Sequence, residues 1–279
     1  MERITHEPTF TQPAAWAWRP APVVVVSLAL HGIAVLAFAV DPGQWPWILA
    51  LLASNHLLLG ALVFAPRGSL LGPNIVRLPE PAAARGEISL TFDDGPDPQI
   101  TPRVLDLLDR QGARASFFCV GERAARFPQL VHEIVRRGHS VENHSQRHSH
   151  AFALYGPRRL RREIRTTQTE LSQITGRRPE FFRAPAGFRS VLLDPVLAGC
   201  GLRYVSWTRR GFDAVSSDAV RVFDRLANGL RAGDILMLHD GARTRAGAPA
   251  VLTVLPRLLD ELSRCGLKSV PLPEAFRDG

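Results

Sequence analysis

Two adjacent carboxylates, Asp93 and Asp94, end an apolar run, and two imidazoles stand four residues apart in HSQRH, His144 to His148. Imidazoles at i and i+4 lie on one face of a helical turn, so they can bind one divalent metal ion together. One carboxylate of the aspartate pair completes a two-histidine, one-carboxylate set that leaves positions open for water and substrate. We therefore predict a site for one divalent ion, zinc first, with cobalt, nickel and manganese as alternatives.

The second carboxylate of the pair is then free for proton transfer. A metal lowers the pKa of the water bound to it, and a base beside it takes the proton. His239 ends a later apolar run, where it can protonate a leaving group, and an aspartate such as Asp213 can hold its charged form. Arg183 and Trp207 end two further runs. Turns alone do not explain this series, so we predict that these side chains meet in one hydrolytic site.

Short apolar runs alternate with segments of helical periodicity from residue 88 onward. This alternation predicts βαβ units and a parallel sheet. The carboxyl ends of parallel strands share one rim, where active residues gather in α/β barrels. Because seven runs are too few for a complete eight-stranded barrel, the predicted fold class is α/β, a distorted (β/α)7 barrel. The predicted strands lie within 88–92, 115–120, 140–143, 181–185, 203–207, 234–239 and 268–272.

The N-terminal quarter of the chain differs in kind from the rest. Uncharged apolar runs at 21–40 and 46–65 each have about the length of a bilayer span, and DPGQW between them predicts a tight turn. We expect a transmembrane helical hairpin; a cleaved signal peptide and two buried core helices are the alternatives. His31, Asn55 and His56 can meet across it. The predicted organisation is an N-terminal tail at 1–20, two transmembrane helices at 21–66, a linker at 67–84 and a catalytic domain at 85–279.

The distribution of charge bears on location and partners. Arg3 and Arg19 precede the hairpin and Arg67 follows it, whereas the turn carries Asp41 and no basic residue. The positive-inside bias places both ends in the cytoplasm of a bacterial inner membrane, with the catalytic domain cytosolic; the periplasmic side is the alternative. The formal net charge of +8 comes almost entirely from arginine, because Lys268 is the single lysine. Without the aromatic interleaving of RNA-binding proteins, this composition favours a membrane surface and no nucleic acid as partner.

Five motifs in order resemble the polysaccharide deacetylases, carbohydrate esterase family four, whose catalytic part is the NodB-homology domain. They are TFDDGP at 91–96, HSQRH at 144–148, RAPAG at 183–187, Trp207 with Asp213 six positions later, and LMLH at 236–239. Each motif alone is weak, but five in this order are a specific signal. The resemblance covers residues 85–275 and implies a distorted barrel of the NodB-homology type. It also implies metal-dependent removal of an acetyl or formyl group from the nitrogen of an amino sugar.

The resemblance assigns roles residue by residue. It implies that Asp93 is the catalytic base, oriented by Arg183, and that Asp94, His144 and His148 bind the metal. It implies that His239 is the general acid and that Asp213 tunes its acidity. Leu236 and Leu238 would line a pocket for the acyl methyl, and Trp207 would contact the substrate. The backbone N–H of Ala186 would bind the oxyanion.

Two departures from the family pattern bear on the substrate. The third motif usually has an aromatic residue after its proline, where this chain has Ala186, and the fourth usually has tryptophan after its aspartate, where it has Ala214. Both aromatics help to build the sugar-binding groove in relatives, whereas Arg209 and Arg210 suit a phosphate or diphosphate. We therefore expect an amino-sugar glycolipid, such as a saccharide on a polyprenyl phosphate. A periplasmic deacetylase of cell-wall or exported polysaccharide and an inactive glycan-binding membrane scaffold are the alternatives.

Overall fold

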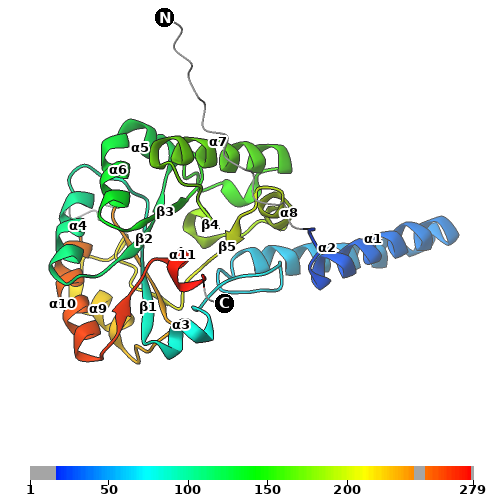
Figure 1. The fold of residues 1–279 in the computed structure, drawn as a ribbon. Helices are drawn as coiled ribbons and strands as arrows, with labels where there is room; N and C mark the ends of the chain where they lie inside the picture. Colours follow the sequence, from blue (N-terminus) through cyan, green and yellow to red (C-terminus); the bar gives the residue numbers. More distant parts are fainter. Residues whose placement is uncertain (1–16, 242–248, 278–279) are drawn as a thin grey trace, which may run out of the picture.

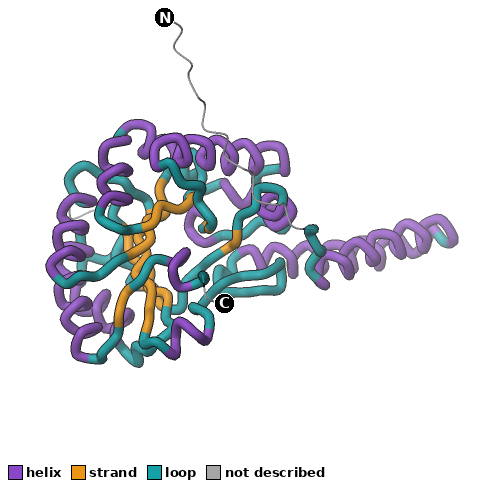
Figure 2. The backbone as a smooth tube through the Cα atoms, in the orientation of Figure 1, coloured by secondary structure: helices purple, strands orange, loops and turns teal. Residues whose placement is uncertain are grey.

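The computed structural model describes residues 17–241 and 249–277, so Arg3 and most of the tail predicted at 1–20 lie outside it. Within these ranges a helical hairpin projects from an α/β domain (Figure 1). Strands fill the centre of the domain, and helices surround them (Figure 2). The fold is a distorted α/β barrel, as the alternation of apolar runs and helical segments predicts.

The sheet is parallel throughout and curls around the domain interior. Its strands in the described residues are β1 Glu87–Asp93, β2 Ala115–Cys119, β3 Ser140–Asn143, β4 Phe181–Phe182, β5 Arg203–Tyr204, β6 Arg209–Arg210, β7 Ile235–His239 and β8 Lys268–Ser269. Their order is β5-β4-β3-β2-β1-β7-β6, and β8 pairs with β1. Each of the seven predicted runs overlaps a strand. The prediction missed β6, because two arginines carry no apolar signal.

Amphipathic helices follow most of the strands. They are α3 Glu80–Ala84, α4 Thr101–Arg110, α5 Gly121–Arg126, α6 Pro128–Arg136, α7 Pro157–Thr175, α8 Leu193–Ala198, α9 Ala219–Ala227, α10 Val251–Arg264 and α11 Leu272–Ala275, with 3₁₀ turns η2 at Phe152–Leu154 and η3 at Pro185–Gly187. Proline in the first turn starts α4, α6 and α7, where its missing N–H has no cost. Gly176, with φ 68°, ends α7 in the left-handed conformation that other residues avoid.

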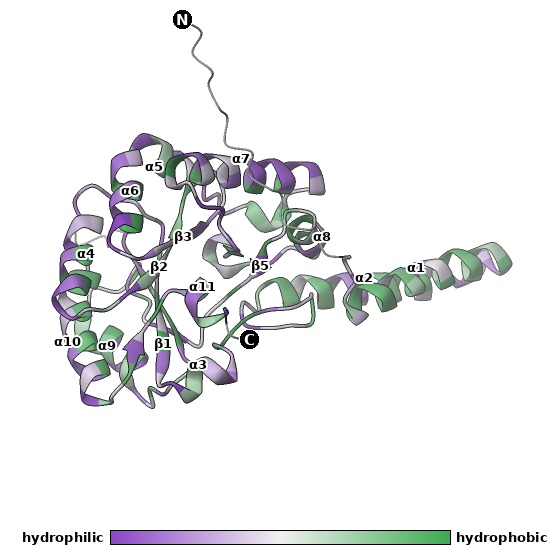
Figure 3. Ribbon diagram, in the orientation of Figure 1, coloured by the Kyte–Doolittle hydropathy of each residue, from purple (hydrophilic) through white to green (hydrophobic). Residues whose placement is uncertain are grey.

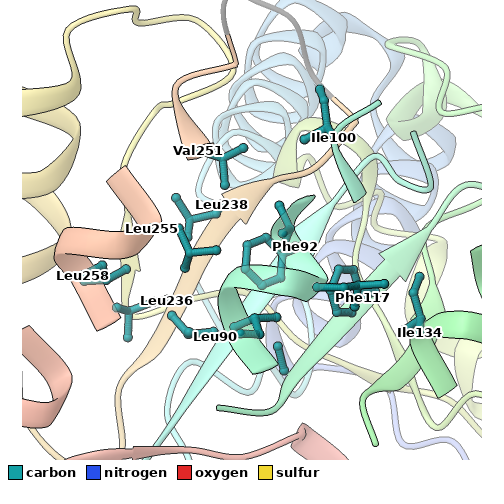
Figure 4. Packing of buried hydrophobic residues seen from close by; sticks show 14 of the residues in the cluster. Leu90, Phe92, Ile100, Phe117, Ile134, Leu236, Leu238, Val251, Leu255 and Leu258 are labelled. Atoms are coloured by element: carbon teal, nitrogen blue, oxygen red, sulfur yellow. The ribbon is translucent and has the colours of Figure 1, made fainter. Parts of the chain in front are cut away.

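The main hydrophobic core lies between the sheet and its outer helices (Figure 4). Leu90 and Phe92 of β1 belong to the same cluster as Leu255 and Leu258 of α10, and none of the four is exposed. Burial of each such side chain contributes about 1.5–3 kcal/mol. Because strand side chains alternate, Asp93 at the end of β1 faces the barrel interior instead.

The same alternation corrects the predicted acyl pocket. Leu236 and Leu238 of β7 belong to the outer core with Phe92 and Val251, and both are fully buried there. Figure 4 shows them among the side chains of that layer. They therefore do not line the site at the rim. The register of the two strands explains this. β7 pairs with β1 so that His239 stands beside Asp93 and faces the barrel interior. Because strand side chains alternate, Leu236 and Leu238 then face outward.

The predicted linker at 67–84 is an ordered part of the barrel. Ile75 forms a parallel bridge to Val205, and Arg77 forms an antiparallel bridge to Asp234. Leu78 is buried in the barrel interior. The two edge strands of the curled sheet are β5 and β6, and they do not pair with each other. The segment lies between these edges, because it bridges to Val205 after β5 and to Asp234 before β7.

Two long helices form the hairpin, α1 Pro22–Val40 and α2 Trp45–Val63, and the turn between them includes the 3₁₀ segment η1 Pro42–Gln44. Both are long and apolar enough to cross a membrane, by length and composition. Only 11% and 6% of their most apolar windows are buried. In Figure 3 the ribbons of both helices have the colour of hydrophobic residues along most of their length. The alternative of two buried core helices is therefore wrong.

Polar residues join the two helices of the hairpin as predicted. The Asn55 amide donates to Ser27 Oγ at 2.9 Å, and both residues are buried. The rings of His31 and His56 meet edge to face with centroids 5.2 Å apart. Hydrogen bonds of this kind stabilise helix pairs where surrounding groups offer no competing partners.

Candidate metal centre and catalytic site

Backbone strain in the described residues gathers at one end of the barrel. Non-glycine residues with positive φ lie in loops that follow the carboxyl ends of strands: Asp94 (73°), Ser145 (65°), His148 (49°), Ala186 (55°) and Phe212 (62°). Such conformations cost on the order of 1–3 kcal/mol each and cluster at functional sites. This rim is also where the predicted ionisable residues lie, which makes it the candidate site.

Asp94, His144 and His148 converge at the rim, and one ligand atom from each lies within 4.8 Å of the others. Nε2 of His148 is 3.0 Å from Oδ1 of Asp94, and Nε2 of His144 is 3.4 Å from it. The segment 144–148 is not the helical turn that we expected from its spacing. It is a loop in which Ser145 and His148 adopt left-handed conformations, and this loop brings both imidazoles to one side.

The donor set fits a divalent cation. Oδ1 of Asp94 is buried and accepts no hydrogen bond in the described part of the chain. Nδ1 of His144 lies 2.9 Å from the carbonyl oxygen of Arg183, which can only accept, so Nδ1 carries the proton and Nε2 offers a lone pair. Burial would raise the pKa of Asp94, but His144 and His148, when their facing nitrogens carry protons, and the charge of His239 hold that pKa well below its ordinary value, so Asp94 is a carboxylate. A carboxylate and imidazole lone pairs at one point are typical of a metal site.

Asp93 belongs to a second group, which is built around a fully buried arginine. Nη1 of Arg183 donates to Oδ1 of Asp93 at 2.7 Å and to Oγ1 of Thr91 at 2.8 Å, and Nη2 donates to the carbonyl of Ser206 at 2.7 Å. The guanidinium also lies 4.1 Å from the ring centroid of Phe118. These contacts leave the guanidinium little freedom, so it fixes the direction of the Asp93 carboxylate. The two adjacent aspartates thus point to different partners, because Asp93 ends the strand and Asp94 begins a left-handed turn.

His239 and Asp213 form a third group. Nδ1 of His239 donates to Oδ1 of Asp213 at 2.9 Å, and Oδ2 of Asp213 accepts the His239 backbone N–H at 2.8 Å. Burial disfavours the imidazolium, but the charge and hydrogen bond of Asp213, with the charges of Asp94 and Asp93, raise the pKa of His239 to about 9. With Nδ1 bound, Nε2 is the nitrogen that can transfer a proton. This arrangement suits a general acid that is protonated near neutral pH.

Two residues with no predicted role, Arg123 and Asp240, support the loop that carries Asp94. Nη1 of Arg123, on α5, donates to the Asp94 carbonyl at 2.6 Å and to the Gly241 carbonyl at 2.9 Å. Asp240 is fully buried beside Gly95 and accepts from Thr101 Oγ1 at 2.6 Å. Burial outweighs that hydrogen bond and raises the pKa of Asp240 to about 7. The position of Asp240 next to His239 was an available signal, whereas nothing local marks Arg123.

The loop after β4 closes another part of the rim. A Cβ on Gly187 would lie 2.6 Å from the Trp207 ring and 2.9 Å from Cβ of Pro66, so only glycine fits between them. Trp207 is 5% exposed and forms a packed wall, not an open platform. In the described residues the backbone N–H of Ala186 donates to no carbonyl or side chain, which leaves it available as a donor.

The two adjacent arginines of β6 have separate environments. Arg209 does not reach the site: Nε donates to Asp234 at 2.5 Å, and its terminal nitrogens donate to the carbonyls of Asn228 and Gly229 at the opposite end of the barrel. The guanidinium of Arg210 lies over the rings of Phe212 and Trp207, 4.7 and 5.2 Å from their centroids. Within the described ranges the guanidinium of Arg210 makes no hydrogen bond or ion pair.

Known proteins share both the sequence and the fold. The sequence model of the family described as polysaccharide deacetylase matches residues 81–205. A peptidoglycan-N-acetylglucosamine deacetylase of Bacillus cereus is 32% identical over 192 residues, which cover 68% of this chain and 88% of that protein. A chitooligosaccharide deacetylase of Azorhizobium caulinodans is 31% identical over 198 residues, with coverages of 68% and 94%.

A solved structure of a deacetylase has a similar fold. The crystal structure of a peptidoglycan N-acetylglucosamine deacetylase, in complex with 4-naphthalen-1-yl-N-oxidanyl-benzamide, matches with a TM-score of 0.66 and 27% sequence identity. The match covers 73% of this chain and 92% of that one, so it includes nearly the whole of the other protein. With more than 30% identity across most of the length of two deacetylases and the same curled sheet, this chain belongs to the polysaccharide deacetylase family, carbohydrate esterase family four.

Proposed function

We propose that the protein is a metal-dependent N-deacetylase that hydrolyses the acetyl group, or a formyl group, from an amino sugar. One observation carries this proposal: Asp94, His144 and His148 meet at the same rim as the Asp93–Arg183 and Asp213–His239 pairs. A ligand set, a fixed carboxylate base and a charged imidazole are the three parts that metal-assisted amide hydrolysis needs. The relatives named as deacetylases of amino-sugar polymers support the same reaction.

Each residue has a task in this mechanism. Asp94, His144 and His148 would hold the ion, zinc by preference, whose positive charge polarises the acyl carbonyl and makes water more acidic. Asp93 accepts the proton of the attacking water, and Arg183 holds its carboxylate in position.

As the carbon–nitrogen bond breaks, Nε2 of His239 gives its proton to the leaving amine, while Asp213 stabilises the imidazolium beforehand. The N–H of Ala186 would donate to the oxyanion that forms at the acyl carbon.

We further propose that the hairpin crosses the bacterial inner membrane twice and that the catalytic domain, residues 85–279, is cytosolic. The apolar length of both helices and the arginines at their flanks support this arrangement. A reporter fused after Gly279 tests the side. Green fluorescence of a fused fluorescent protein with no alkaline phosphatase activity supports the cytosol, and strong alkaline phosphatase activity of the matching fusion contradicts it.

The substrate that we propose is an amino sugar on a phosphate-bearing lipid. Arg210 supports it, because this guanidinium lies beside the site between two aromatic rings without a carboxylate partner in the described residues. The end of the hairpin supports it too: Pro66 lies against Gly187, and Nη1 of Arg67 donates to the Thr208 carbonyl at 3.2 Å. A saccharide attached to a lipid would therefore approach the rim from the nearby membrane.

Two experiments test the substrate. Mass spectrometry of glycolipids and envelope glycans, from cells with and without the gene, should show the mass of one acetyl or formyl group retained on a glycolipid when the gene is absent. Purified enzyme that releases acetate from soluble chitooligosaccharide as fast as from glycolipid would contradict the lipid-linked substrate.

The arginine pair supplies a matched control. We expect Arg210→Gln to lower kcat/KM for a phosphate-bearing glycolipid about 10-fold or more, as loss of a charge-assisted hydrogen bond does. Arg209→Gln should leave kcat/KM nearly unchanged, because Arg209 binds at the other end of the barrel. Equal losses in both variants would contradict a direct role for Arg210.

A further inference from the structure

Exposed large apolar side chains outside the hairpin region, residues 17–64, lie only around the catalytic rim in the described part of the chain. We call this set the apolar rim: Leu70, Leu154, Leu192, Phe212, Val215 and Val220. Leu154 is 86% exposed and Val215 is 78% exposed, so these two side chains have almost no protein contact. Single exposed apolar residues are ordinary on a protein surface, but a set confined to one end marks an interaction surface.

The positions of these residues in the fold define one end of the barrel. Leu154 lies in η2, after β3, and Leu192 lies between β4 and α8. Phe212 and Val215 lie in the loop after β6, and Val220 lies in the first turn of α9, which follows that loop. Leu70 comes shortly after α2 and completes the set. The loops that lead from helices into strands, at the opposite end, carry no such side chain in the residues that the structure describes.

The hairpin is fixed to the same end. The indole of Trp18, before α1, donates to Oδ2 of Asp194 at 3.0 Å, and Oδ1 of Asp194 pairs with Arg189 at 3.0 Å. The backbone N–H of Arg189 donates to the carbonyl of Val63, at the end of α2, at 3.3 Å. Both ends of the hairpin are thus bonded to the segment 189–194, which carries Leu192.

A second junction restricts the orientation of the hairpin. The rings of Phe64 and Phe188 meet edge to face, with centroids 4.9 Å apart. Arg189 is 2% exposed, and Nη1 donates to the carbonyls of Gly72 and Pro73 at 2.9 and 3.0 Å. Because the terminal nitrogens of this buried arginine bind two carbonyls and the Asp194 carboxylate between the helices and the barrel, the hairpin cannot swing freely. A membrane around the hairpin would therefore meet a defined face of the domain.

We propose that the apolar rim rests on the surface of the lipid bilayer that surrounds the hairpin, so that the catalytic site opens toward the lipid headgroups. This inference rests on the proposed membrane anchoring and goes beyond it, because a hairpin can tether a domain that stays in water. Continuity identifies the bilayer as the occupant: Leu192 lies in the segment 189–194 to which both ends of the hairpin are bonded, and Leu70 follows the end of α2. Arg67, which is exposed and close to Leu70 in the chain, is placed to meet lipid phosphates while the apolar rim enters the interfacial layer of the bilayer.

Site-specific fluorescence on the full chain in liposomes tests this orientation. Cys119 and Cys200 are buried, and Cys265 is the exposed thiol, so Cys265→Ser provides a background for single labels. Leu154→Cys and Val215→Cys each receive an environment-sensitive NBD probe on the apolar rim. The lipids are phosphatidylcholine and phosphatidylglycerol, with brominated phosphatidylcholine as the quencher.

Two control labels separate the possible results. A probe on native Cys265, which caps the end of α10 at the opposite end of the barrel, reports a surface in water. A probe at Leu36→Cys, in α1, reports whether the hairpin is in the bilayer. We expect blue-shifted emission and quenching by brominated lipid at positions 36, 154 and 215, and neither effect at 265.

The outcomes that overturn the inference are distinct from one another. Quenching at position 36 with water-like emission at 154 and 215 means that the hairpin anchors a domain that stands away from the membrane. Blue-shifted emission at 154 and 215 without quenching by brominated lipid means that protein, such as a second copy of the chain, covers the rim. If the probe at position 36 is not quenched either, the proposed membrane anchoring by the hairpin is wrong as well. Deacetylation is measured separately, so none of these results depends on the proposed reaction.

Discussion

Two buried aspartates that pair with arginine, Asp93 and Asp234, stand at opposite ends of the barrel, and the comparison separates a catalytic group from a structural one. At the rim, Asp93 accepts from Arg183 through Oδ1, and no hydrogen bond to its other oxygen occurs in the described residues. At the opposite end, Asp234 accepts from Arg77 and Arg209 at 2.5 Å each and also from the Arg231 backbone N–H at 3.2 Å. The first carboxylate keeps an oxygen free for a proton, whereas the second is saturated.

This difference shows why the type of residue does not by itself reveal its role. Both aspartates are at most 3% exposed, and both neutralise arginine. Asp234 joins the segment around Arg77 to β6 and β7, so its bonds close the barrel. Asp93 lies at the rim beside Asp94 and His239. Substitutions at the two ends should therefore change different properties of the protein, and the expected effects on turnover fall in the following order.

The largest effect should come from the metal ligands. His148→Ala removes an imidazole nitrogen 3.0 Å from Asp94, so bound zinc should fall from about one ion per chain to near zero. Turnover should fall to background, a loss of at least about 10²–10⁴-fold. Elemental analysis and acetate release measure the two changes. His150→Ala is the control, because this neighbouring imidazole is not among the predicted ligands; zinc loss there as well would contradict the ligand set.

The next effect should separate the two adjacent aspartates. Asp93→Asn keeps the shape of the side chain and leaves Asp94 in place, so zinc should stay bound while kcat falls about 10²–10⁴-fold through loss of the base. Zinc content and kcat are measured on the same preparation. If Asp93→Asn loses zinc as completely as Asp94→Ala, the division of roles between the aspartates is wrong.

A smaller effect should appear in the pH profile of Asp213→Asn. His239 must carry a proton to act as acid, so activity should decline as pH rises through its pKa of about 9. Removing the Asp213 charge lowers that pKa, so the alkaline limb should move to lower pH, with turnover at the optimum reduced about 10-fold. The measurement is kcat/KM against pH for both proteins. An alkaline limb that stays in place would show that Asp213 does not tune the acid.

The smallest effect on turnover should come from Asp234→Asn at the opposite end. Loss of this buried carboxylate leaves Arg77 and Arg209 with weaker partners and should lower the free energy of unfolding by about 1–3 kcal/mol. Because the catalytic rim is distant in the fold, kcat should change by no more than about twofold. Chemical denaturation and acetate release test the two parts. A loss of kcat comparable to that of Asp93→Asn would erase the distinction between the two ends.

Much of the fold and the meeting of the site residues could be predicted from the sequence. Parallel strands end at one rim, so polar residues after successive apolar runs had to lie there. Asp94, His144 and His148 accordingly meet, although the loop between the two histidines is not helical. The hairpin followed from apolar length alone, and its predicted contacts through Asn55 and between His31 and His56 are confirmed.

The side-chain directions were predicted less well. Leu236 and Leu238 were predicted to line the acyl pocket but face the outer core. This error was avoidable, because an inward-facing His239 and the alternation of strand side chains place both leucines on the outer face. The directions of Arg209 and Arg210 depend on the pairing of β6 with β7, and two arginines give no hydrophobic pattern from which to predict it. The closing role of 67–84 depends on bridges to Val205 and Asp234, which are far away in the sequence. Contacts of this kind leave no local signal.

The most direct test of the central claim is a metal titration of acetate release. Enzyme stripped of metal by a chelator is assayed on N-acetylated envelope glycolipids and chitooligosaccharides while zinc is added back, beside His148→Ala treated in the same way. We predict that stripped enzyme is inactive, that activity returns in proportion to zinc and saturates at about one ion per chain, and that His148→Ala does not recover. Full acetate release by the stripped enzyme, or recovery of His148→Ala at the same zinc concentration, would contradict metal-dependent deacetylation at this rim.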